Sequence, residues 1–267
     1  MDIRVLGPLS AEIDGVSFVP SAGKPRQLLS LLALNANQVL PVPTLMEEIW
    51  GTEMPPSALT TLQTYILQLR RLIGAALGPD SPIDPKQVLV TRHGGYLLQV
   101  PPEAVDAYRY ERLIAAGNDA LDQGDDVSGS ARLREAMATW RGSALVDVKI
   151  GPLLEIELVR LEESRLVALE QRIDAELRMG RHAELLTELT TLIARHPLHE
   201  GLHAQYMTAL YRAGRQVRAL EVYQGLRGRL VEELGLEPST RIRQLHRAIL
   251  GADPGLDAAR YQRRAAA

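Results

Sequence analysis

The chain of 267 residues contains no cysteine, which excludes disulfide bonds and thiolate chemistry. It also contains no apolar run near the ~18 residues that would indicate a membrane span. The N-terminal residues 1–7 lack the charged and apolar regions of a signal peptide and are typical of a strand. We therefore expect a cytoplasmic protein with no membrane segment.

An excess of positive charge is absent as well. The formal net charge is −3, and residues 1–100 hold seven basic against eight acidic residues. This balance argues against non-specific binding to nucleic acid, so any DNA-binding surface must be locally basic. The hydrophobic fraction of 46% and the charged fraction of 24% are ordinary for a globular protein, and the length allows two domains. Five basic residues lie on elements that we expect to face DNA: Lys24, Arg26, Arg70, Arg71 and Arg92.

Most enzyme signatures are missing, including a Walker loop, a Gly-x-Gly-x-x-Gly turn and a Gly-x-Ser-x-Gly elbow. The exception is His199-Glu200-Gly201-Leu202-His203, which matches the His-Glu-x-x-His pattern of zinc hydrolases. Gly201 weakens the helix that this pattern needs, and no third ligand follows at a recognised spacing, although His196 lies close by in the sequence. We favour a polar helix start, with a zinc hydrolase as a distant alternative, and expect no catalytic residue, metal or cofactor.

The most informative pattern is a long amphipathic helix over residues 57–73. Leu62, Ile66, Leu69 and Ile73 recur at spacings of four, three and four, so they share one buried face. An amphipathic surface helix alone explains this pattern, but two preceding helices and a following basic hairpin favour DNA recognition. The remaining faces carry side chains that can reach phosphates and base edges: Thr60, Thr61, Thr64, Gln68, Arg70 and Arg71.

Residues 88–100 are typical of two short strands around a turn at Gly94-Gly95. Arg92 stands just before this turn, where it can reach a minor groove or a phosphate. A solvated turn charge is the alternative interpretation of Arg92. We include His93 and Gly94 with Arg92 as candidate DNA contacts at the hairpin tip.

Shorter elements precede the long helix. Residues 3–5, 11–13 and 16–19 read as strands, and a helix is expected from Lys24-Pro25, with proline at its first position, to Asn35. A second helix follows Pro43 and stops at Gly51, with Leu45, Ile49 and Trp50 inward. Ser57 is the expected N-cap of the long helix. Strands, three helices and a terminal hairpin together predict a winged helix-turn-helix over residues 1–100, an α+β domain in a mainly α protein.

Pro101-Pro102 marks a predicted domain boundary, after which the chain reads as helix to residue 250. Gly180-Arg181 recurs as Gly214-Arg215, an offset of 34 that is the period of tetratricopeptide repeats. We therefore expect an all-α, tetratricopeptide-like repeat domain over residues 103–250 and a mobile tail over 251–267. The helical segments expected are 104–123, 127–140, 152–179, 182–195, 199–213, 216–234 and 239–250.

Five segments together give the chain a resemblance to the SARP family, the Streptomyces antibiotic regulatory proteins. They are residues 24–34, 57–71, 91–96, 213–223 and 232–239. The second domain resembles the bacterial transcriptional activation domain of that family, and the nearest likeness is to pathway-specific activators of aromatic polyketide clusters. The resemblance implies an OmpR-type winged helix that binds direct repeats in promoters and recruits RNA polymerase through its sigma factor.

Residue by residue, the resemblance carries DNA contacts onto Tyr65, Leu67, Gln68, Arg70 and Arg92. Leu67 and Gln68 depart from a more arginine-rich pattern in some relatives, which puts a shared base preference in doubt. No receiver domain precedes the winged helix, so we expect control through abundance and not through phosphorylation of a receiver. Direct repeats imply protomers arranged head to tail as a homo-oligomer on DNA.

The sequence thus predicts a transcriptional activator of an antibiotic biosynthetic cluster. The alternative from another class is a protein-interaction scaffold whose winged helix binds protein. The scaffold interpretation predicts no salt-dependent affinity for DNA and no effect of substituting Arg92.

Overall fold

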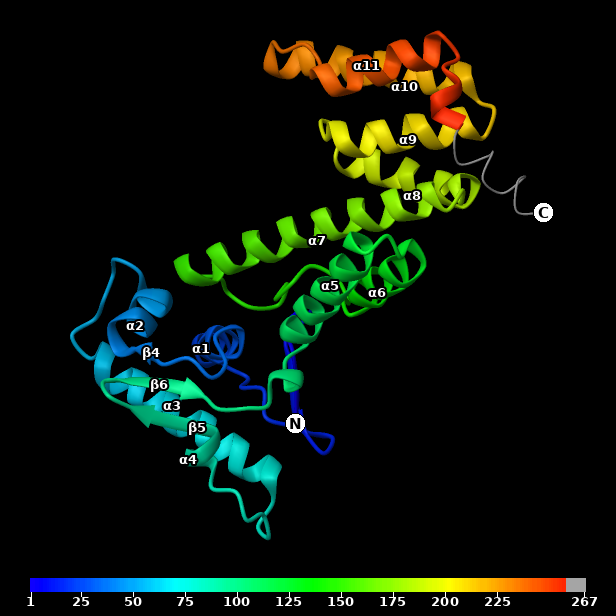
Figure 1. Ribbon diagram of the computed structural model, residues 1–267. Helices are drawn as coiled ribbons and strands as arrows, with labels where there is room; N and C mark the ends of the chain where they lie inside the picture. The colour runs from blue at the N-terminus through cyan, green and yellow to red at the C-terminus, as the bar shows by residue number, and fades with distance from the viewer. Residues whose placement is uncertain (258–267) are drawn as a thin grey trace. The chain divides into compact units, whose positions relative to one another are not determined.

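The computed structural model describes residues 1–257, so the last ten residues of the predicted tail lie outside it (Figure 1). The chain is mainly helical, as predicted, and divides into two compact units. The first unit comprises residues 1–115 and 135–165; the second comprises 116–134 and the chain from 166 onward. The first unit continues past Pro101-Pro102, where the sequence predicts a domain boundary. The units therefore do not coincide with the predicted domains 1–100 and 103–250, whose limits stay predictions. Three helices contribute to both units: α5 (Asp106–Asp122), α6 (Asp126–Ala138) and α7 (Pro152–Arg178).

Two small antiparallel sheets belong to the first unit. In one, β1 (Asp2–Arg4), β2 (Ser10–Ile13) and β3 (Val16–Ser17) follow each other in order, close to the predicted strands. The other sheet has the order β4-β6-β5. Its strand β4 spans only two residues, which is too short for sequence periodicity to reveal. The bounds are β4 (Leu40–Pro41), β5 (Leu89–Arg92) and β6 (Gly95–Leu98).

The helices of this unit differ from prediction mainly at their ends. The first begins at Gly23, so Pro25 is its third residue and not its first. Ser57 does hold the N-cap position of the long helix, but its hydroxyl makes no capping bond; only its carbonyl oxygen accepts from Thr61. The bounds are α1 (Gly23–Leu34), α2 (Val42–Trp50), α3 (Ala58–Leu77), an unpredicted short α4 (Pro85–Val88) and η1 (Pro102–Ala104).

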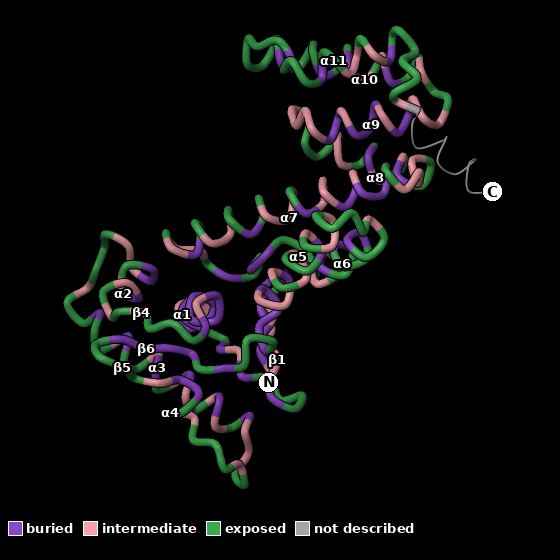
Figure 2. The backbone as a smooth tube through the Cα atoms, in the orientation of Figure 1, coloured by how far each residue is buried: buried purple, intermediate pink, exposed green. Residues whose placement is uncertain are grey.

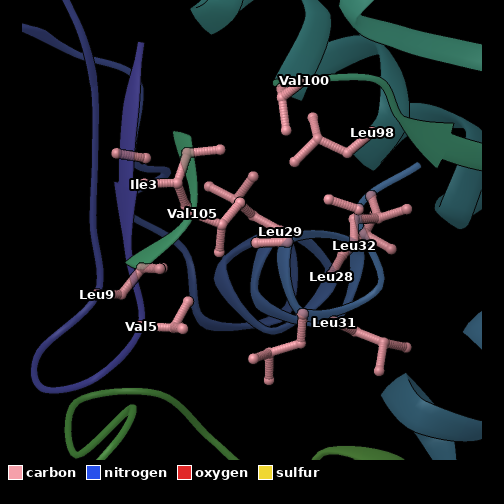
Figure 3. Close-up of a cluster of buried hydrophobic side chains, with 14 of the residues drawn as sticks. Ile3, Val5, Leu9, Leu28, Leu29, Leu31, Leu32, Leu98, Val100 and Val105 are labelled. Carbon is pink, nitrogen blue, oxygen red and sulfur yellow. The ribbon is translucent and has the colours of Figure 1, made fainter. Parts of the chain in front are cut away.

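Helix α1 runs through the middle of the core of the first unit (Figure 3). Its residues from Gln27 to Leu34 are all buried, and a helix that is apolar on nearly all sides is an interior helix. Leu28 and Leu32 have no exposed surface. The side chains drawn around α1 come from the N-terminal segment 3–9 and from the segment at and after β6: Ile3, Val5, Leu9, Leu98, Val100 and Val105.

A buried carboxylate on α2 holds the start of α7. Glu48 is only 2% exposed, and its Oε1 accepts a hydrogen bond from the Gly151 backbone N–H at 2.9 Å. Its Oε2 accepts from Leu153 and Leu154 at 2.8 and 3.1 Å. The Gln27 amide adds a bond of 2.9 Å to Oε1. Glu48 therefore satisfies the free N–H groups at the first turn of α7, where the helix dipole also favours negative charge.

A second buried carboxylate, on α5, bonds the backbone that follows strand β1. Asp106, 2% exposed, accepts hydrogen bonds from the backbone N–H groups of Val5 and Leu6 at 2.8 and 3.1 Å. Burial raises the pKa of Asp106, while these two bonds and the charge of Arg141 act in the opposite direction. The N-terminal strand is thereby tied to the beginning of α5.

The second unit is entirely helical in its described residues (Figure 2). Buried residues recur along its helices, and their core includes Leu185, Leu189, Met207, Leu210 and Tyr223. The predicted helix over 216–234 ends early, because residues 230–234 widen into a π-turn. The bounds are α8 (His182–Arg195), α9 (Glu200–Arg212), α10 (Gln216–Arg229), η2 (Leu230–Leu234), α11 (Thr240–Leu250) and η3 (Pro254–Asp257).

The 34-residue repeat is visible in how the helices end. After α7, Gly180 donates to Leu177 O at 3.1 Å and Arg181 donates to Glu176 O at 2.9 Å. After α9, Gly214 and Arg215, which lie 34 positions later, form the same two bonds. Gly180 and Gly214 both have φ of 77°. This left-handed closure satisfies the last carbonyl groups of a helix and turns the chain back. The same pair of bonds closes α5 at Gly124-Asp125 and α11 at Ala252-Asp253. The predicted repeat is confirmed.

Candidate nucleic-acid interface

Helix α3 buries one face and leaves the opposite face exposed along its N-terminal half. Leu62, Ile66, Leu69 and Ile73 are all buried, as predicted. The exposed residues follow at spacings of three and four, and Leu67 among them is 49% exposed. Leu59 and Ala75 are exposed on this helix as well, and we call the other five exposed residues the α3 row: Thr60, Gln63, Thr64, Leu67 and Arg71. Gln63 is absent from the sequence prediction, although its position three residues after Thr60 and four before Leu67 would have revealed it.

Arg70 and Arg71 are neighbours with different environments. Arg70 Nε and Nη2 donate to Leu89 O at 2.9 and 2.7 Å, and Nη2 also donates to Thr91 Oγ1 at 2.8 Å. Arg70 thus joins α3 to strand β5, and these donors are not available to a base. Arg71 is exposed and forms no hydrogen bond or ion pair with any described residue.

Strands β5 and β6 form a hairpin whose tip is His93-Gly94. Arg92 pairs with Gly95 across the hairpin, and the two residues between them have φ of 29° and 78°. The prediction of a Gly94-Gly95 turn is therefore wrong by one residue. Gly95 lies within β6, where a Cβ atom would come 2.4 Å from Leu40 O, so only glycine allows β4 to pair there. Arg92 and His93 are exposed beside the turn.

An aromatic contact brings the beginning of α1 to α3. Lys24 Nζ lies 5.0 Å from the centroid of the Trp50 ring, and Trp50 stacks on Tyr65 with centroids 6.2 Å apart and an interplanar angle of 14°. Trp50 was predicted as a core residue only. It is half-buried and supports two candidate DNA contacts, Lys24 and Tyr65, at once.

Other predicted contacts lie less favourably. Arg26 forms an ion pair with Asp147, whose second oxygen accepts from Leu9 N at 2.8 Å, so the charge of Arg26 is balanced within the first unit. We leave Arg26 out of the interface proposed below. The Thr64 hydroxyl donates to Thr60 O on its own helix at 3.0 Å, which leaves its oxygen as an acceptor. Thr61 and Gln68 are half-exposed on the flanks of the α3 row.

The geometry suits recognition of a DNA groove. The α3 row combines hydroxyl, amide, apolar and guanidinium groups along one face of a helix. A guanidinium pairs with guanine or phosphate, an amide pairs with adenine, and an apolar side chain contacts the methyl group of thymine. The hairpin tip adds Arg92, which can contact a phosphate or a minor groove.

The His199–His203 pattern serves the ends of helices. His199 Nδ1 accepts from Leu202 N at 3.3 Å, and Glu200 accepts from Ser239 N at 3.0 Å, which fixes the start of α11. His203 is buried, its Nδ1 bonds His199 O at 3.0 Å, and burial lowers its pKa. Within residues 1–257 no three potential ligands gather as a metal site would require, and no helix is both long and apolar enough to cross a membrane.

Two family models match the chain. Residues 19–98 match the model described as transcriptional regulatory protein, C terminal, and residues 105–250 match the bacterial transcriptional activator domain. Together they cover α1 to β6 and the helical region up to α11.

Among curated proteins, the regulatory protein DnrI of Streptomyces peucetius is 56% identical over 96% of this chain and 94% of its own length. The transcriptional regulator RedD of Streptomyces coelicolor is 35% identical over 96% of this chain and 72% of its own length. The regulatory protein AfsR of the same species is 39% identical over 94% of this chain, which spans only 24% of AfsR.

A solved structure has the same fold. Mycobacterium tuberculosis EmbR, in complex with a low-affinity phosphopeptide, superposes with a TM-score of 0.88 at 32% identity. The match covers 98% of this chain and 68% of the EmbR chain. The predicted combination of a winged helix and a helical activator domain is therefore confirmed.

Proposed function

The chain belongs to the SARP family, the Streptomyces antibiotic regulatory proteins, and we propose that it activates a secondary-metabolite gene cluster. Its relatives are transcriptional regulators and not enzymes. In our proposal it binds direct repeats in promoters of the cluster, head to tail, and recruits RNA polymerase through the sigma factor.

The observation that carries this proposal is the α3 row. Five residues of mixed hydrogen-bonding and apolar character line one helix face, and described residues leave them exposed. A helix that only stabilised the fold would not need a guanidinium, two hydroxyls and an amide at regular spacing on that face. The overall charge of −3 adds no general attraction to DNA, so specificity has to come from this row and the hairpin.

We assign different tasks to the basic residues. Arg71, together with Gln63 and Leu67, reads base edges in the major groove, and Arg92 contacts the backbone or the minor groove. Arg70 positions the hairpin relative to α3 through Leu89 and does not read bases. Lys24 contacts a phosphate from its place over Trp50.

The second unit supports polymerase contact and self-association. Stacked helical repeats present extended surfaces to protein partners, and the 34-residue closures show that this unit is such a stack. Head-to-tail protomers on direct repeats would form a heterologous interface, in which different faces of two copies meet.

The first test is fluorescence anisotropy of the full chain with duplexes from promoters of the neighbouring gene cluster, over a salt series, with scrambled duplexes as controls. We expect tight binding to one duplex with a steep salt dependence. Arg71→Ala should weaken that binding by about 1–3 kcal/mol and relax sequence preference. Arg92→Ala should weaken all duplexes alike and lower the salt slope by about one.

Arg112→Ala is the matched control, because Arg112 is an exposed arginine on α5 in the same unit. It should leave affinity unchanged. Duplexes with one or two copies of the repeat then test head-to-tail occupancy. Equal or absent binding to every duplex would favour the protein-interaction scaffold over the activator.

A further inference from the structure

Leu67 is an apolar side chain in the middle of the α3 row. It is 49% exposed and lies outside the hydrophobic core of the first unit. The row members one helical turn before it are Gln63 and Thr64, and the member one turn after it is Arg71. A single leucine on a protein surface needs no explanation, but a leucine set between amide, hydroxyl and guanidinium groups on a face proposed to read DNA does. The role of Leu67 therefore depends on what it covers in the groove.

The helical rise places Leu67 between two side chains that can read base edges. At about 1.5 Å per residue, Leu67 stands about 6 Å along the axis from Gln63 and the same distance from Arg71. Base pairs follow one another at about 3.4 Å, so each of these two side chains lies within about two base-pair steps of Leu67. In the proposed complex, Leu67 therefore covers a base pair between those within reach of Gln63 and Arg71.

Only one of the four bases offers an aliphatic side chain a favourable contact in the major groove. The edges of guanine, adenine and cytosine present hydrogen-bonding groups, whereas thymine also presents its 5-methyl group. Leu67 has no donor or acceptor, so against the other edges it would displace water without replacing the lost hydrogen bonds. Leu67 therefore attracts a methyl group and disfavours the bases that lack one.

We propose that Leu67 is a specificity-determining residue, which requires a pyrimidine with a 5-methyl group at this position of each repeat. The inference rests on the proposed DNA interface and names the chemical group that the middle of the α3 row recognises. Thymine meets the requirement. Because Leu67 forms no hydrogen bond, it distinguishes the methyl group and not the group at the 4-position of the ring, so 5-methylcytosine meets the requirement as well. Methylation of a cytosine at that position then raises the affinity for DNA.

The test compares thymine with deoxyuridine, which lacks only the methyl group. Each thymine of the duplex that the full chain binds most tightly is replaced singly by deoxyuridine, and affinities are measured by fluorescence anisotropy. We expect one thymine per repeat at which the replacement weakens binding about four-fold, the effect of one methyl group that is no longer buried. Leu67→Asn, which keeps the approximate size of the side chain but makes it polar, should bind the thymine and deoxyuridine duplexes equally. Leu67→Met should keep the difference.

Leu59→Asn is the matched control. Leu59 is 48% exposed on the same helix, but at about 3.6 residues per turn it lies about 80° around the axis from Leu67. This variant should keep the difference between thymine and deoxyuridine. A second pair of duplexes carries a C·G pair in place of that T·A pair, with the cytosine either unmodified or 5-methylated. Methylation should strengthen binding about four-fold in the wild-type chain and not in Leu67→Asn.

Four results would overturn the inference: no thymine at which deoxyuridine weakens binding, a Leu67→Asn variant that keeps the full difference, a Leu59→Asn variant that loses it, or no gain from methylation of the cytosine. In each of these cases, a preference of the wild-type chain for one duplex over scrambled DNA would still support the proposed activator. Absence of any such preference would overturn both proposals.

Discussion

Each of the two units is stabilised internally by a different kind of contact. In the first, buried carboxylates bridge residues about a hundred positions apart in sequence: Asp106 bonds Val5, and Glu48 bonds Gly151. In the second, the contacts span shorter separations: the buried Glu176 accepts from Ser130, 46 positions away, and one glycine closure returns after 34 residues. A unit stabilised by distant bonds should unfold as one body, whereas stacked repeats add their stabilities along the chain. We therefore expect a single substitution to lower the free energy of unfolding most in the first unit.

The largest effect should come from Glu48→Ala. Removal of this carboxylate leaves three backbone N–H groups at the start of α7 without an acceptor, and we expect the free energy of unfolding to fall by about 3 kcal/mol. Both tryptophans, Trp50 and Trp140, lie in the first unit, so urea titration followed by tryptophan fluorescence reports on it. Glu47→Ala, the exposed neighbour, should change stability by less than about 0.5 kcal/mol. Similar values for the two variants would remove the contrast between the units.

The next effect separates Arg70 from Arg71. Arg70→Ala should lower the stability of the first unit by about 1.5 kcal/mol, because it removes the bonds from α3 to Leu89 and Thr91. Arg71→Ala should leave stability within about 0.5 kcal/mol and weaken only DNA binding. The same urea titration checks the first expectation. An Arg70→Ala variant that keeps its stability but loses its base preference would show that Arg70 reads bases.

In the second unit, two glycines should respond with opposite signs. Gly214→Ala places a Cβ at φ of 77° and should cost about 1 kcal/mol, although no atom stands in the way. Gly225→Ala, on the exposed side of helical α10, should stabilise by up to about 1 kcal/mol. Hydrogen exchange of α9 and α10 measures both. Exchange that also rises in α2 and α3 for Gly214→Ala would show that the units do not unfold separately.

The smallest effect concerns pH. Burial lowers the pKa of His203, while its bond to His199 offsets part of the shift. The unfolded chain then binds a proton more readily than the folded one, so stability is full above the ordinary histidine pKa of 6.5 and falls as the pH drops below it. Hydrogen exchange of the second unit at pH 7.5 and 5.5 should show this loss, and His203→Gln should reduce it. An unchanged dependence in the variant would assign the loss to other groups.

Local patterns were predictable from the sequence. The buried face of α3 follows from four apolar residues at helical spacing, and the repeat follows from Gly180 and Gly214, which are needed for a left-handed turn. The hairpin was predicted correctly, but its turn was not. Two adjacent glycines give no indication of which one turns the chain, and the answer depends on the approach of Leu40 to Gly95.

Roles that depend on distant partners were not predictable. Arg70 lies on a flank of α3 that the sequence assigns to DNA, and only the position of Leu89 shows that it faces β5. Glu48 reads as an ordinary surface acid of α2 until Gly151 is placed beside it. The pairing of Arg26 with Asp147 is hidden for the same reason. Sequence periodicity gives the face of a helix but not what packs against it.

Because Glu48 caps the N-terminus of α7, it limits where genes for such regulators could recombine without loss of stability. A gene exchange at Pro101-Pro102 would deliver a winged helix whose buried carboxylate meets a foreign segment in place of Gly151, Leu153 and Leu154. Asp106 would be exchanged away from Val5 and Leu6 in the same event. We therefore expect an exchanged winged helix to need its own residues 135–165 in order to fold stably. New promoter preferences should arise more readily by substitutions in the α3 row than by shuffling of whole domains.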